Sequence, residues 1–279
     1  MAAVLAPGLY VVATPLGNLA DLTARAAEVL KQADLIACED TRQTRKLLDH
    51  VGVTKPAVSY HEHNEAERTP ELLERLRAGE RVALVSDAGT PLVSDPGYRL
   101  VRAALEAGIP VVPVPGPSAV VAALSAAGLP SEAFYFGGFL PRKQGERRRV
   151  LQALRDVPGT LVFYEAPHRI VEALADVSFA LADPPVVVAR ELTKVHEEFL
   201  RGAASEVRGV LSRRESVKGE ITLLIGPRAA RQPEEPLAEA VRRYQREGLA
   251  PMEALKRAAR ERGMSKREAY RALKSHDAS

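Results

Sequence analysis

The sequence is poor in the residues that build covalent or metal frameworks. Its 279 residues include one cysteine, Cys38, and no tryptophan. A single cysteine excludes an internal disulfide framework and a cysteine-based metal site. No apolar run approaches the roughly 18 to 20 residues of a membrane span, and residues 1–8 lack the basic start and apolar core of a signal peptide. We therefore expect a globular cytoplasmic protein that has no membrane partner.

Two nucleotide-binding fingerprints are also missing. No expected strand is followed by Gly-x-Gly-x-x-Gly, which would indicate an ordinary Rossmann dinucleotide site. The Walker pattern of a P-loop is absent as well. The sequence therefore supports neither kind of site.

The near-even charge balance conceals a basic end. The whole chain has a net charge of +3, but residues 228–279 hold 13 Lys/Arg and 8 Asp/Glu, a net charge of +5. The remainder holds 26 Lys/Arg and 28 Asp/Glu, a net charge of −2. A basic appendage on a near-neutral body is typical of a segment that holds a polyanion, although solvated basic helices are also common.

The most informative stretch runs from residue 81 to residue 119. An apolar run at Val82–Val85 and a second one at Val111–Val114 suit buried strands, and Tyr98–Ala107 between them has helical spacing. Both strands end in loops of Gly, Pro and small hydroxyl residues, which let a backbone approach a ligand closely. Such loops can also be simple turns. Two of them, one βαβ unit apart, predict a shared pocket at the carboxyl ends of the strands.

Strand and helix patterns alternate over residues 1–117. Strands are expected at Gly8–Ala13 and Ala33–Cys38, with a helix from Asp21 to Leu30 and another from Thr69 to Gly79. This alternation predicts a parallel α/β domain in this part of the chain.

A second α/β domain is expected over residues 118–228. It begins with an Ala-rich helix at residues 118–128 and has further strands at Thr160–Tyr164, Val186–Ala189 and Ile221–Ile225. Each of these strands adjoins a polar segment.

A small helical module is expected over residues 237–279, after a Pro- and Glu-rich linker. Helices are predicted at Pro251–Arg262 and Ser265–Lys274, and Ser265 with Glu268 forms a capping-box pattern. This helix-turn-helix pattern suits a nucleic-acid reader, and a packing arm between subunits is the alternative.

Aromatic residues gather beside arginines in the stretch Phe134–Pro141. Arg142, Lys143 and the run Arg147–Arg149 follow directly. Aromatic rings next to arginines can stack unpaired bases and hold phosphates. A core strand followed by a solvated basic helix start explains the pattern equally well.

The chain resembles, in the order and spacing of its motifs, the ribosomal RNA small subunit methyltransferase I family of the tetrapyrrole methylase superfamily. The motifs are TPLGNLADLT, EDTR, HEHNE, VSDAGTPLVSDPGY, VPGPSA, GFLPRK, FYEAPHR, ARELTKVHE and KGE. The resemblance covers roughly residues 8–227, and the tail resembles the family's small helical addition.

The resemblance implies a fold, an activity and partners. The fold is α/β, with two domains, a cofactor in the interdomain cleft and a small C-terminal helical module. The activity is S-adenosylmethionine-dependent methylation of the ribose 2′-hydroxyl of a cytidine in 16S rRNA. The partners are 16S rRNA or the small ribosomal subunit, with a homodimer as the assembly and no DNA. The first loop reads Thr-Pro-Leu-Gly rather than a Gly-rich sequence, which argues against a porphyrin or corrin substrate.

The resemblance also implies which residues contact the cofactor. In the first domain they are Pro15, Leu16, Asp87, Gly89, Thr90 and Val93, and at the start of the second domain they are Ser118 and Ala119. In the second domain they are Phe163, Tyr164, Ala189, Ile221 and Thr222. The rule that ligands bind beyond the carboxyl ends of strands independently indicates the three loops around residues 15, 90 and 118.

Methyl transfer to a hydroxyl asks a protein to align the reactants and to accept a proton. The candidate proton acceptors at strand ends are Glu39, Asp40, His61, Asp87, Glu191 and Lys194. We favour Glu39 and Asp40 with Arg42, together with Asp87, as the catalytic group. A structural ion-pair network that fixes the loop is the alternative. His61 and His63 resemble a metal pair only weakly, so we expect no metal.

A further set of residues is expected to position RNA through phosphate or base contacts. These are His61, Asn64, Arg142, Lys143, Arg169 and Lys194. Two other functions remain open: methylation of a small macrocycle by the same fold, and a non-catalytic RNA-binding role in ribosome assembly.

Overall fold

A computed structural model describes residues 4–227, 235–262 and 264–276. The chain divides into two compact units, Met1–Gly226 and Pro227–Ser279. Across the described ranges, no helix has both the length and the apolar character to cross a membrane.

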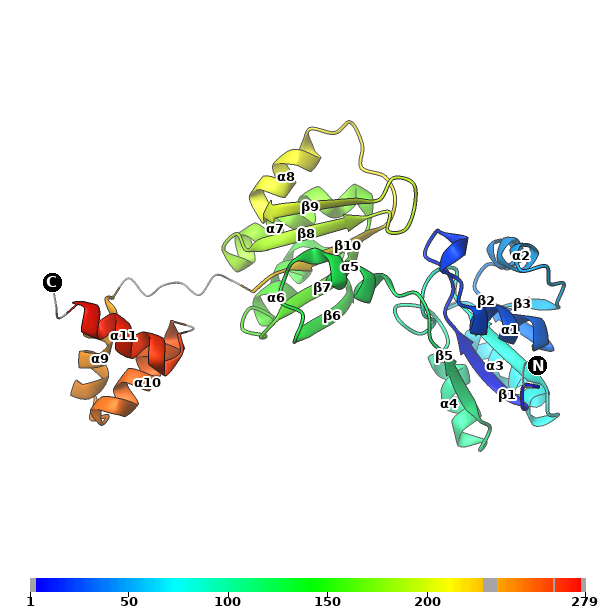
Figure 1. The fold of residues 1–279 in the computed structure, drawn as a ribbon. Helices are drawn as coiled ribbons and strands as arrows, with labels where there is room; N and C mark the ends of the chain where they lie inside the picture. The colour runs from blue at the N-terminus through cyan, green and yellow to red at the C-terminus, as the bar shows by residue number, and fades with distance from the viewer. Residues whose placement is uncertain (1–3, 228–234, 263, 277–279) are drawn as a thin grey trace. The chain divides into compact units, whose positions relative to one another are not determined.

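The first sheet is parallel and has the strand order β3-β2-β4-β1-β5 (Figure 1). Its strands are β1 Gly8–Val12, β2 Leu35–Cys38, β3 Ala57–Ser59, β4 Arg81–Val85 and β5 Val111–Val114. The predicted parallel α/β arrangement is therefore confirmed. All five strands point the same way, so the loops that follow them meet at one edge of the sheet.

Helices cover both faces of this sheet because its strands are apolar on both sides. Ile36 and Cys38 pack with α1 (Ala24–Gln32) and α2 (Thr41–His50). Leu35 and Ala37 point to the opposite face and pack with α3 and α4. The last two helices are α3 Glu65–Arg77 and α4 Tyr98–Glu106.

Helix α3 begins four residues earlier than expected, at Glu65 rather than Thr69. Pro70 has the character of a helix-start signal, but it lies inside the helix. A proline there withdraws one hydrogen bond, from the carbonyl of Ala66. Ala66 and Pro70 are both exposed, so water can replace that bond.

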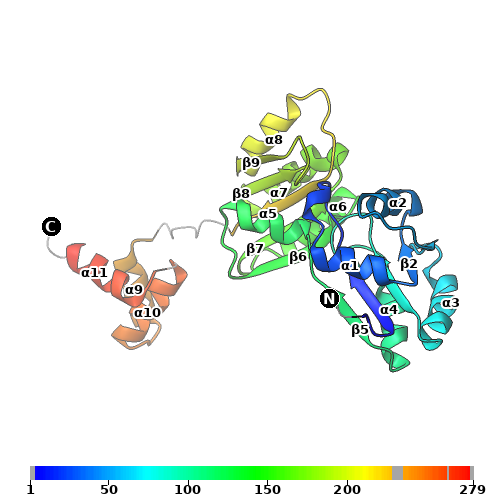
Figure 2. The same ribbon diagram turned by 45° about the vertical axis from the view of Figure 1, so that its right-hand side comes forward.

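The second sheet is mixed and has the strand order β6-β7-β10-β8-β9 (Figure 2). Its strands are β6 Phe134–Phe139, β7 Thr160–Glu165, β8 Pro185–Arg190, β9 Glu198–Ala203 and β10 Ile221–Ile225. β6 and β7 run parallel, whereas the pairings of β10 with β7 and β8, and of β8 with β9, are antiparallel. The sequence did not indicate β9, an edge strand whose residues are all partly exposed.

Helices also cover both faces of the second sheet. On one face lie α6 Gln144–Ala153, α7 Ile170–Leu181 and α8 Ala204–Ser212. On the other lies α5 Ala119–Ala127, where Leu16 from the loop after β1 joins the same apolar cluster. The proposed domain boundary at residues 117–118 lies in the loop between β5 and α5.

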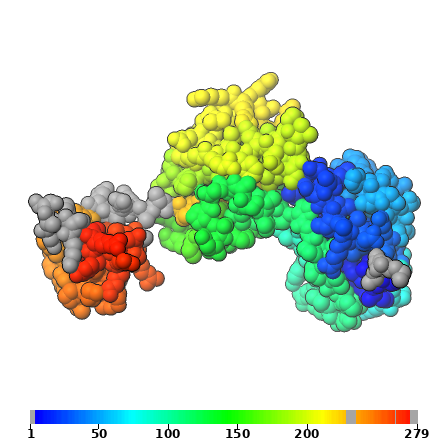
Figure 3. All heavy atoms as spheres, viewed as in Figure 1, coloured from blue at the N-terminus to red at the C-terminus, as the bar shows by residue number. Residues whose placement is uncertain are grey.

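The C-terminal unit consists of α9 Leu237–Arg246, α10 Pro251–Glu261 and α11 Lys266–His276, packed into one compact body (Figure 3). The expected capping box of α11 is confirmed: the backbone N–H of Glu268 donates to Ser265 Oγ at 3.2 Å, and the N–H of Ser265 donates to Glu268 Oε2 at 2.7 Å. Helix α9 was not predicted. Its Val241 and Tyr244 supply much of the small core.

Candidate functional site

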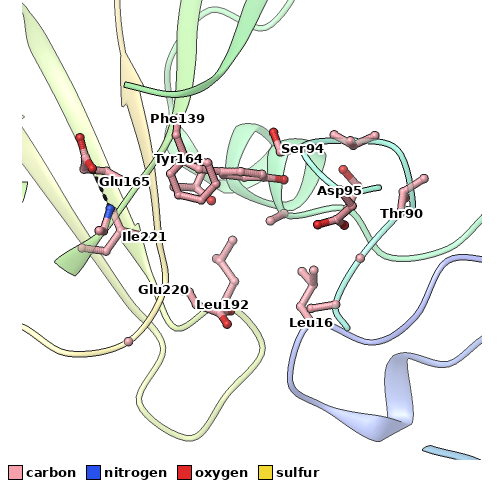
Figure 4. A pocket seen from close by; sticks show the side chains of 18 of the residues that line it. Leu16, Thr90, Ser94, Asp95, Phe139, Tyr164, Glu165, Leu192, Glu220 and Ile221 are labelled. Atoms are coloured by element: carbon pink, nitrogen blue, oxygen red, sulfur yellow. Dashed lines mark hydrogen bonds between the residues drawn. The ribbon is translucent and has the colours of Figure 1, made fainter. Parts of the chain in front are cut away.

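A cavity of about 310 Å³ lies where loops from the two sheets come together (Figure 4). Its size falls in the range of small-molecule sites. Many of the expected cofactor residues line it: Leu16, Gly89, Thr90, Val93, Ser118, Ala119, Tyr164, Ile221 and Thr222. These residues come from three loops of the first half, from the end of β7 (Tyr164) and from the start of β10 (Ile221 and Thr222).

Four expected cofactor residues do not line the cavity. Pro15 is buried beside Leu16, and Asp87 lies exposed on the loop after β4. Phe163 and Ala189 are buried in the apolar layers of the second sheet. Successive side chains of a strand point to opposite faces, so Tyr164 reaches the cavity and its neighbour Phe163 cannot.

Backbone hydrogen bonds tie the loop after β1 to the loop after β4. Thr14 and Gly89 exchange two such bonds, of 2.8 and 3.0 Å. Thr90 Oγ1 donates to the carbonyl of Pro117 at 3.1 Å, which fixes the third loop. Gly89 has a φ of 81°, and a Cβ there would come within 3.2 Å of Leu16 Cδ2. The part of the cavity wall that these three loops form is therefore tightly packed.

The central loop also contains two residues in an unfavourable backbone conformation. Leu92 and Ser94 have positive φ angles of 71° and 68°. Such angles are uncommon for residues other than glycine and are kept where the surrounding structure demands them. Asp95 follows directly and lines the cavity.

Glu39, Asp40 and Asp87 form an acidic corner at the ends of β2 and β4. The backbone N–H of Asp40 donates to Asp87 Oδ1 at 3.0 Å. The carboxylate of Asp40 caps α2 by accepting the N–H of Arg42 at 2.8 Å. It also pairs with the Arg42 side chain at 2.9 Å. These bonds to Arg42 lower the pKa of Asp40 to about 2. The Asp40–Arg42 pair therefore agrees with the alternative interpretation, an ion pair that fixes the loop.

The other carboxyls of the corner hold their protons more tightly. Burial raises the pKa of Glu39, and the negative charge of Asp87 adds to that effect while His61 opposes it. Burial, followed by the charge of Glu39, raises the pKa of Asp95 to about 6. Asp95 therefore lines the cavity and also interacts electrostatically with Glu39 and Asp87 of the acidic corner.

Asp95 was missed as a candidate from the sequence. The one available signal was that Ser94-Asp95 repeats the pair Ser86-Asp87 within a single loop. Phe139, Leu192 and Glu220 also line the cavity and were not expected there.

Tyr164 forms an aromatic wall of the cavity. Its ring lies edge-on to Phe136 and Phe139, with centroids 5.0 and 5.5 Å away. Burial raises the pKa of Tyr164 to about 12, and the negative charges of Asp95 and Glu220 contribute. Its hydroxyl therefore stays protonated at neutral pH.

Three of the residues expected to position RNA have internal partners. Asn64 accepts the N–H of His61 at 2.8 Å and donates to the carbonyl of Ser59 at 3.1 Å. Arg169 donates to the carbonyl of Leu140 at 2.6 Å and pairs with Glu165 at 2.8 Å. Lys194 pairs with Glu191 at 2.9 Å and with Glu220 at 3.2 Å.

The other three residues differ in their exposure. Arg142 and Lys143 are exposed on the turn before α6. Arg147 holds this turn from behind by donating to the carbonyls of Pro141 and Arg142 at 3.3 and 3.1 Å. Nδ1 of His61 is buried and has no hydrogen-bond partner among the described residues.

The His61 and His63 rings lie edge-on, with centroids 6.0 Å apart. In the part of the chain that the structure describes, no three His, Cys, Asp or Glu side chains are grouped as metal ligands.

Comparison with known families gives a match over most of the first unit. The family of tetrapyrrole (corrin/porphyrin) methylases matches residues 8–208. Proteins named ribosomal RNA small subunit methyltransferase I are similar over nearly the whole chain. The one from Halalkalibacterium halodurans is 46% identical over 94% of this chain and 93% of its own length. The one from Synechocystis sp. is 46% identical over 94% and 95%.

Solved structures share the fold at lower identity. A diphthine synthase has a TM-score of 0.61 at 19% identity, covering 78% of this chain and 89% of its own. A uroporphyrin-III C-methyltransferase from Thermus thermophilus, complexed with S-adenyl homocysteine, has a TM-score of 0.56 at 23% identity, covering 78% and 96%. The expected tetrapyrrole methylase-like fold is confirmed.

Proposed function

Because the chain belongs to the ribosomal RNA small subunit methyltransferase I family of the tetrapyrrole methylases, we propose that it methylates the ribose 2′-hydroxyl of a cytidine in 16S rRNA. The proposed methyl donor is S-adenosylmethionine. Relatives with the rRNA methyltransferase name are 43–50% identical, whereas solved corrin and porphyrin methyltransferases are 19–24% identical. The higher identity favours RNA over a tetrapyrrole as substrate.

The observation that carries the proposal is the cavity between the two sheets. Apolar side chains such as Leu16 and Leu192 line it together with hydroxyls and carboxylates. An apolar lining with a few polar groups is typical of small-molecule sites. The carboxylate of Asp95 faces the space between Tyr164 and Leu16 (Figure 4).

The lining residues therefore fit S-adenosylmethionine, which supplies an electrophilic methyl group when bound. Thr90, Val93 and Ser118 would hold it from the loops after β4 and β5, and Tyr164 and Ile221 from the second sheet. Their task is to fix the donor so that the attacking hydroxyl meets the methyl group in line with the sulfur. The acidic corner stands beside this cavity and provides candidates for the proton acceptor.

The basic surfaces supply the RNA contacts in this proposal. Arg142 and Lys143 stand on a turn that follows Phe139, itself a residue of the cavity wall. The C-terminal unit exposes further cations on α10 and α11, among them Arg257 and Arg267. Each phosphate contact should add to the salt dependence of RNA binding. We further propose that the protein acts in the cytoplasm as a homodimer.

The test uses the purified protein, S-adenosylmethionine with a labelled methyl group, and small subunits or naked 16S rRNA from cells that lack the protein. We expect label in one cytidine, whose 3′-phosphodiester should resist alkaline cleavage because its 2′-oxygen is methylated. Uroporphyrinogen III is the parallel substrate and should take up no label. Label on a base, or on the macrocycle alone, would contradict the proposal. Calorimetry of S-adenosylmethionine binding distinguishes an enzyme, which should bind the donor, from a pure RNA-binding factor, which should not.

A further inference from the structure

We propose that Asp95 is the catalytic residue that accepts the proton of the target hydroxyl, an inference that rests on the proposed function. In this step the hydroxyl oxygen forms a bond to the methyl carbon while the carbon–sulfur bond breaks. The electron pair of that bond leaves with sulfur, which becomes a neutral thioether. The hydroxyl proton moves to the Asp95 carboxylate, so charge and atoms balance.

The position of Asp95 supports this role. It lines the cavity on the side of the central loop, and its carboxylate points into the space bounded by Tyr164 and Leu16 (Figure 4). The loop presents it by holding Leu92 and Ser94 at positive φ angles. Conformations of this kind are energetically unfavourable and cluster at functional sites. The chain thus keeps an unfavourable turn where it delivers a carboxylate to the cavity.

The neighbours of Asp95 explain why it is a stronger base than the other acids. Burial is the largest cause of the raised pKa of Asp95. The negative charges of Glu39 and Asp87, at the ends of β2 and β4, add to it, and a hydrogen bond with the Ser86 side chain opposes it. Tyr164 faces Asp95 from β7. No Lys or Arg is among the groups that shift the pKa of Asp95, which stands at about 6. A carboxyl with that pKa is about nine-tenths ionised at pH 7.

The alternatives are weaker on geometric and chemical grounds. Asp40 has its carboxylate occupied by the N-terminus of α2 and by Arg42, with a pKa of about 2. A base of that strength accepts protons poorly near neutral pH. Glu39 does not line the cavity. The acidic corner therefore acts on the reaction through Asp95, whose basicity it raises.

The experiment compares the full-length protein with Asp95→Asn, which removes the charge at constant size, and with Asp95→Glu, which keeps a carboxylate. Glu106→Gln is the matched control, because Glu106 is an exposed carboxylate on α4 that pairs with the exposed Arg102. Circular dichroism and thermal melting check that all variants fold. The readouts are calorimetric affinities for S-adenosylmethionine and S-adenosylhomocysteine, and single-turnover rates at saturating donor from pH 5 to 9.

We expect Asp95→Asn to bind both molecules as the unaltered protein does and to lose about 10²- to 10⁴-fold in single-turnover rate. The rate of the unaltered protein should fall as the pH drops below about 6, because a protonated Asp95 carboxyl can no longer accept the proton of the hydroxyl. Asp95→Asn should lack this acid limb, and Asp95→Glu should keep it with a reduced rate. Carbon-13 NMR of labelled aspartate should show a carboxyl titrating near pH 6 in the unliganded protein, absent from Asp95→Asn.

Other outcomes overturn the inference. Loss of affinity for S-adenosylmethionine with unchanged affinity for S-adenosylhomocysteine would make Asp95 a partner of the sulfonium instead of a base. A rate in Asp95→Asn equal to that of Glu106→Gln would remove Asp95 from the chemistry while leaving the proposed function intact. If the unaltered protein binds no S-adenosylmethionine, the proposed function itself fails, whatever Asp95→Asn does.

Discussion

The backbone N–H of Asp40 donates a 3.0 Å hydrogen bond to the side chain of Asp87. This bond joins the loops that follow β2 and β4, two neighbouring strands of the first sheet. It uses one carboxylate oxygen of Asp87, while the carboxylate of Asp40 is turned to the N-terminus of α2. The acidic corner is therefore an ordered structure, in which Asp87 holds Asp40 and adds negative charge beside Glu39 and Asp95.

Asp87→Asn should separate these two roles of Asp87. The amide oxygen of Asn still accepts the Asp40 N–H, but the negative charge that raises the pKa of Asp95 is gone. We expect the acid limb of the single-turnover rate to move to lower pH by some tenths of a unit, with little loss of stability. Asp87→Ala should show the same movement and also unfold more easily. If the acid limb stays at the same pH in both variants, the charge of Asp87 does not raise the pKa of Asp95 as proposed.

A second prediction concerns Gly89. Gly89→Ala forces a side chain into a left-handed conformation (φ 81°) and brings Cβ to 3.2 Å from Leu16 in the cavity wall. We expect a loss of about 1–2 kcal/mol in stability and a clear loss of affinity for S-adenosylmethionine. Gly79→Ala is the control, because its φ is 87° and no described atom lies within 4 Å of the added Cβ. It should lose similar stability in denaturant unfolding and keep its affinity in calorimetry; equal affinities in the two variants would count against the cavity as the donor site.

The fold was largely predictable because buried strands and amphipathic helices leave periodic patterns in the sequence. The parallel strands of the first sheet are an example. Local start signals were also reliable at Ser265, where the predicted capping box forms. The errors fall where tertiary context outweighs local signals. Pro70 looks like a helix start but lies inside α3. Strand β9 has no fully buried residue to mark it, and it exists because it pairs with β8.

The site was predictable at the level of loops and less so at the level of side chains. Glycine- and proline-rich strand ends indicated the cavity, whose lining includes Leu16 and Thr90. The raised pKa of Asp95 depends on its burial in the folded chain and on the charge of Glu39, which lies far from it in the sequence. Arg169 looked free to bind RNA, but its reach to the carbonyl of Leu140 exists only in the folded chain. Partners of long charged side chains cannot be obtained from spacing alone.

A third prediction concerns the pH dependence of stability through Glu198. Arg214 and Arg190 pair with Glu198 at 2.6 and 3.0 Å and lower its pKa from 4.5 to about 2. Because the folded-state pKa is depressed, the stabilisation is fully present above about pH 4.5 and is lost as the pH falls toward 2. Glu198→Gln should therefore lower the free energy of unfolding at pH 7 by about 1–2 kcal/mol, a value reduced for partial exposure.

The difference between Glu198→Gln and the unaltered protein should shrink steadily in urea unfolding between pH 5 and pH 3. Glu74→Gln is the control, because Glu74 pairs with Arg77 on the surface of α3 with both side chains largely exposed. It should change stability by less than about 0.5 kcal/mol at either pH. A Glu198→Gln deficit that is as large at pH 3 as at pH 7 would show that the ion pairs are not its cause.

The last prediction concerns Asp176, whose buried carboxylate neutralises the cations behind the basic turn before α6. It pairs at 2.6 Å both with Arg147, which is buried, and with Arg148. Asp176→Ala leaves the charge of Arg147 buried without its carboxylate, which costs about 3–5 kcal/mol. Arg147 also holds the carbonyls of Pro141 and Arg142, so its displacement should disturb the turn that presents Arg142 and Lys143.

Glu172→Gln is the control on the same helix, because Glu172 is exposed and lies 4.0 Å from Arg147. We expect denaturant unfolding to show the large loss for Asp176→Ala and less than about 0.5 kcal/mol for Glu172→Gln. At a temperature where both variants are folded, filter binding should show weaker RNA affinity for Asp176→Ala alone. Unchanged RNA affinity in a destabilised Asp176→Ala would mean that the basic turn does not contact RNA, or that Arg147 does not hold it in place.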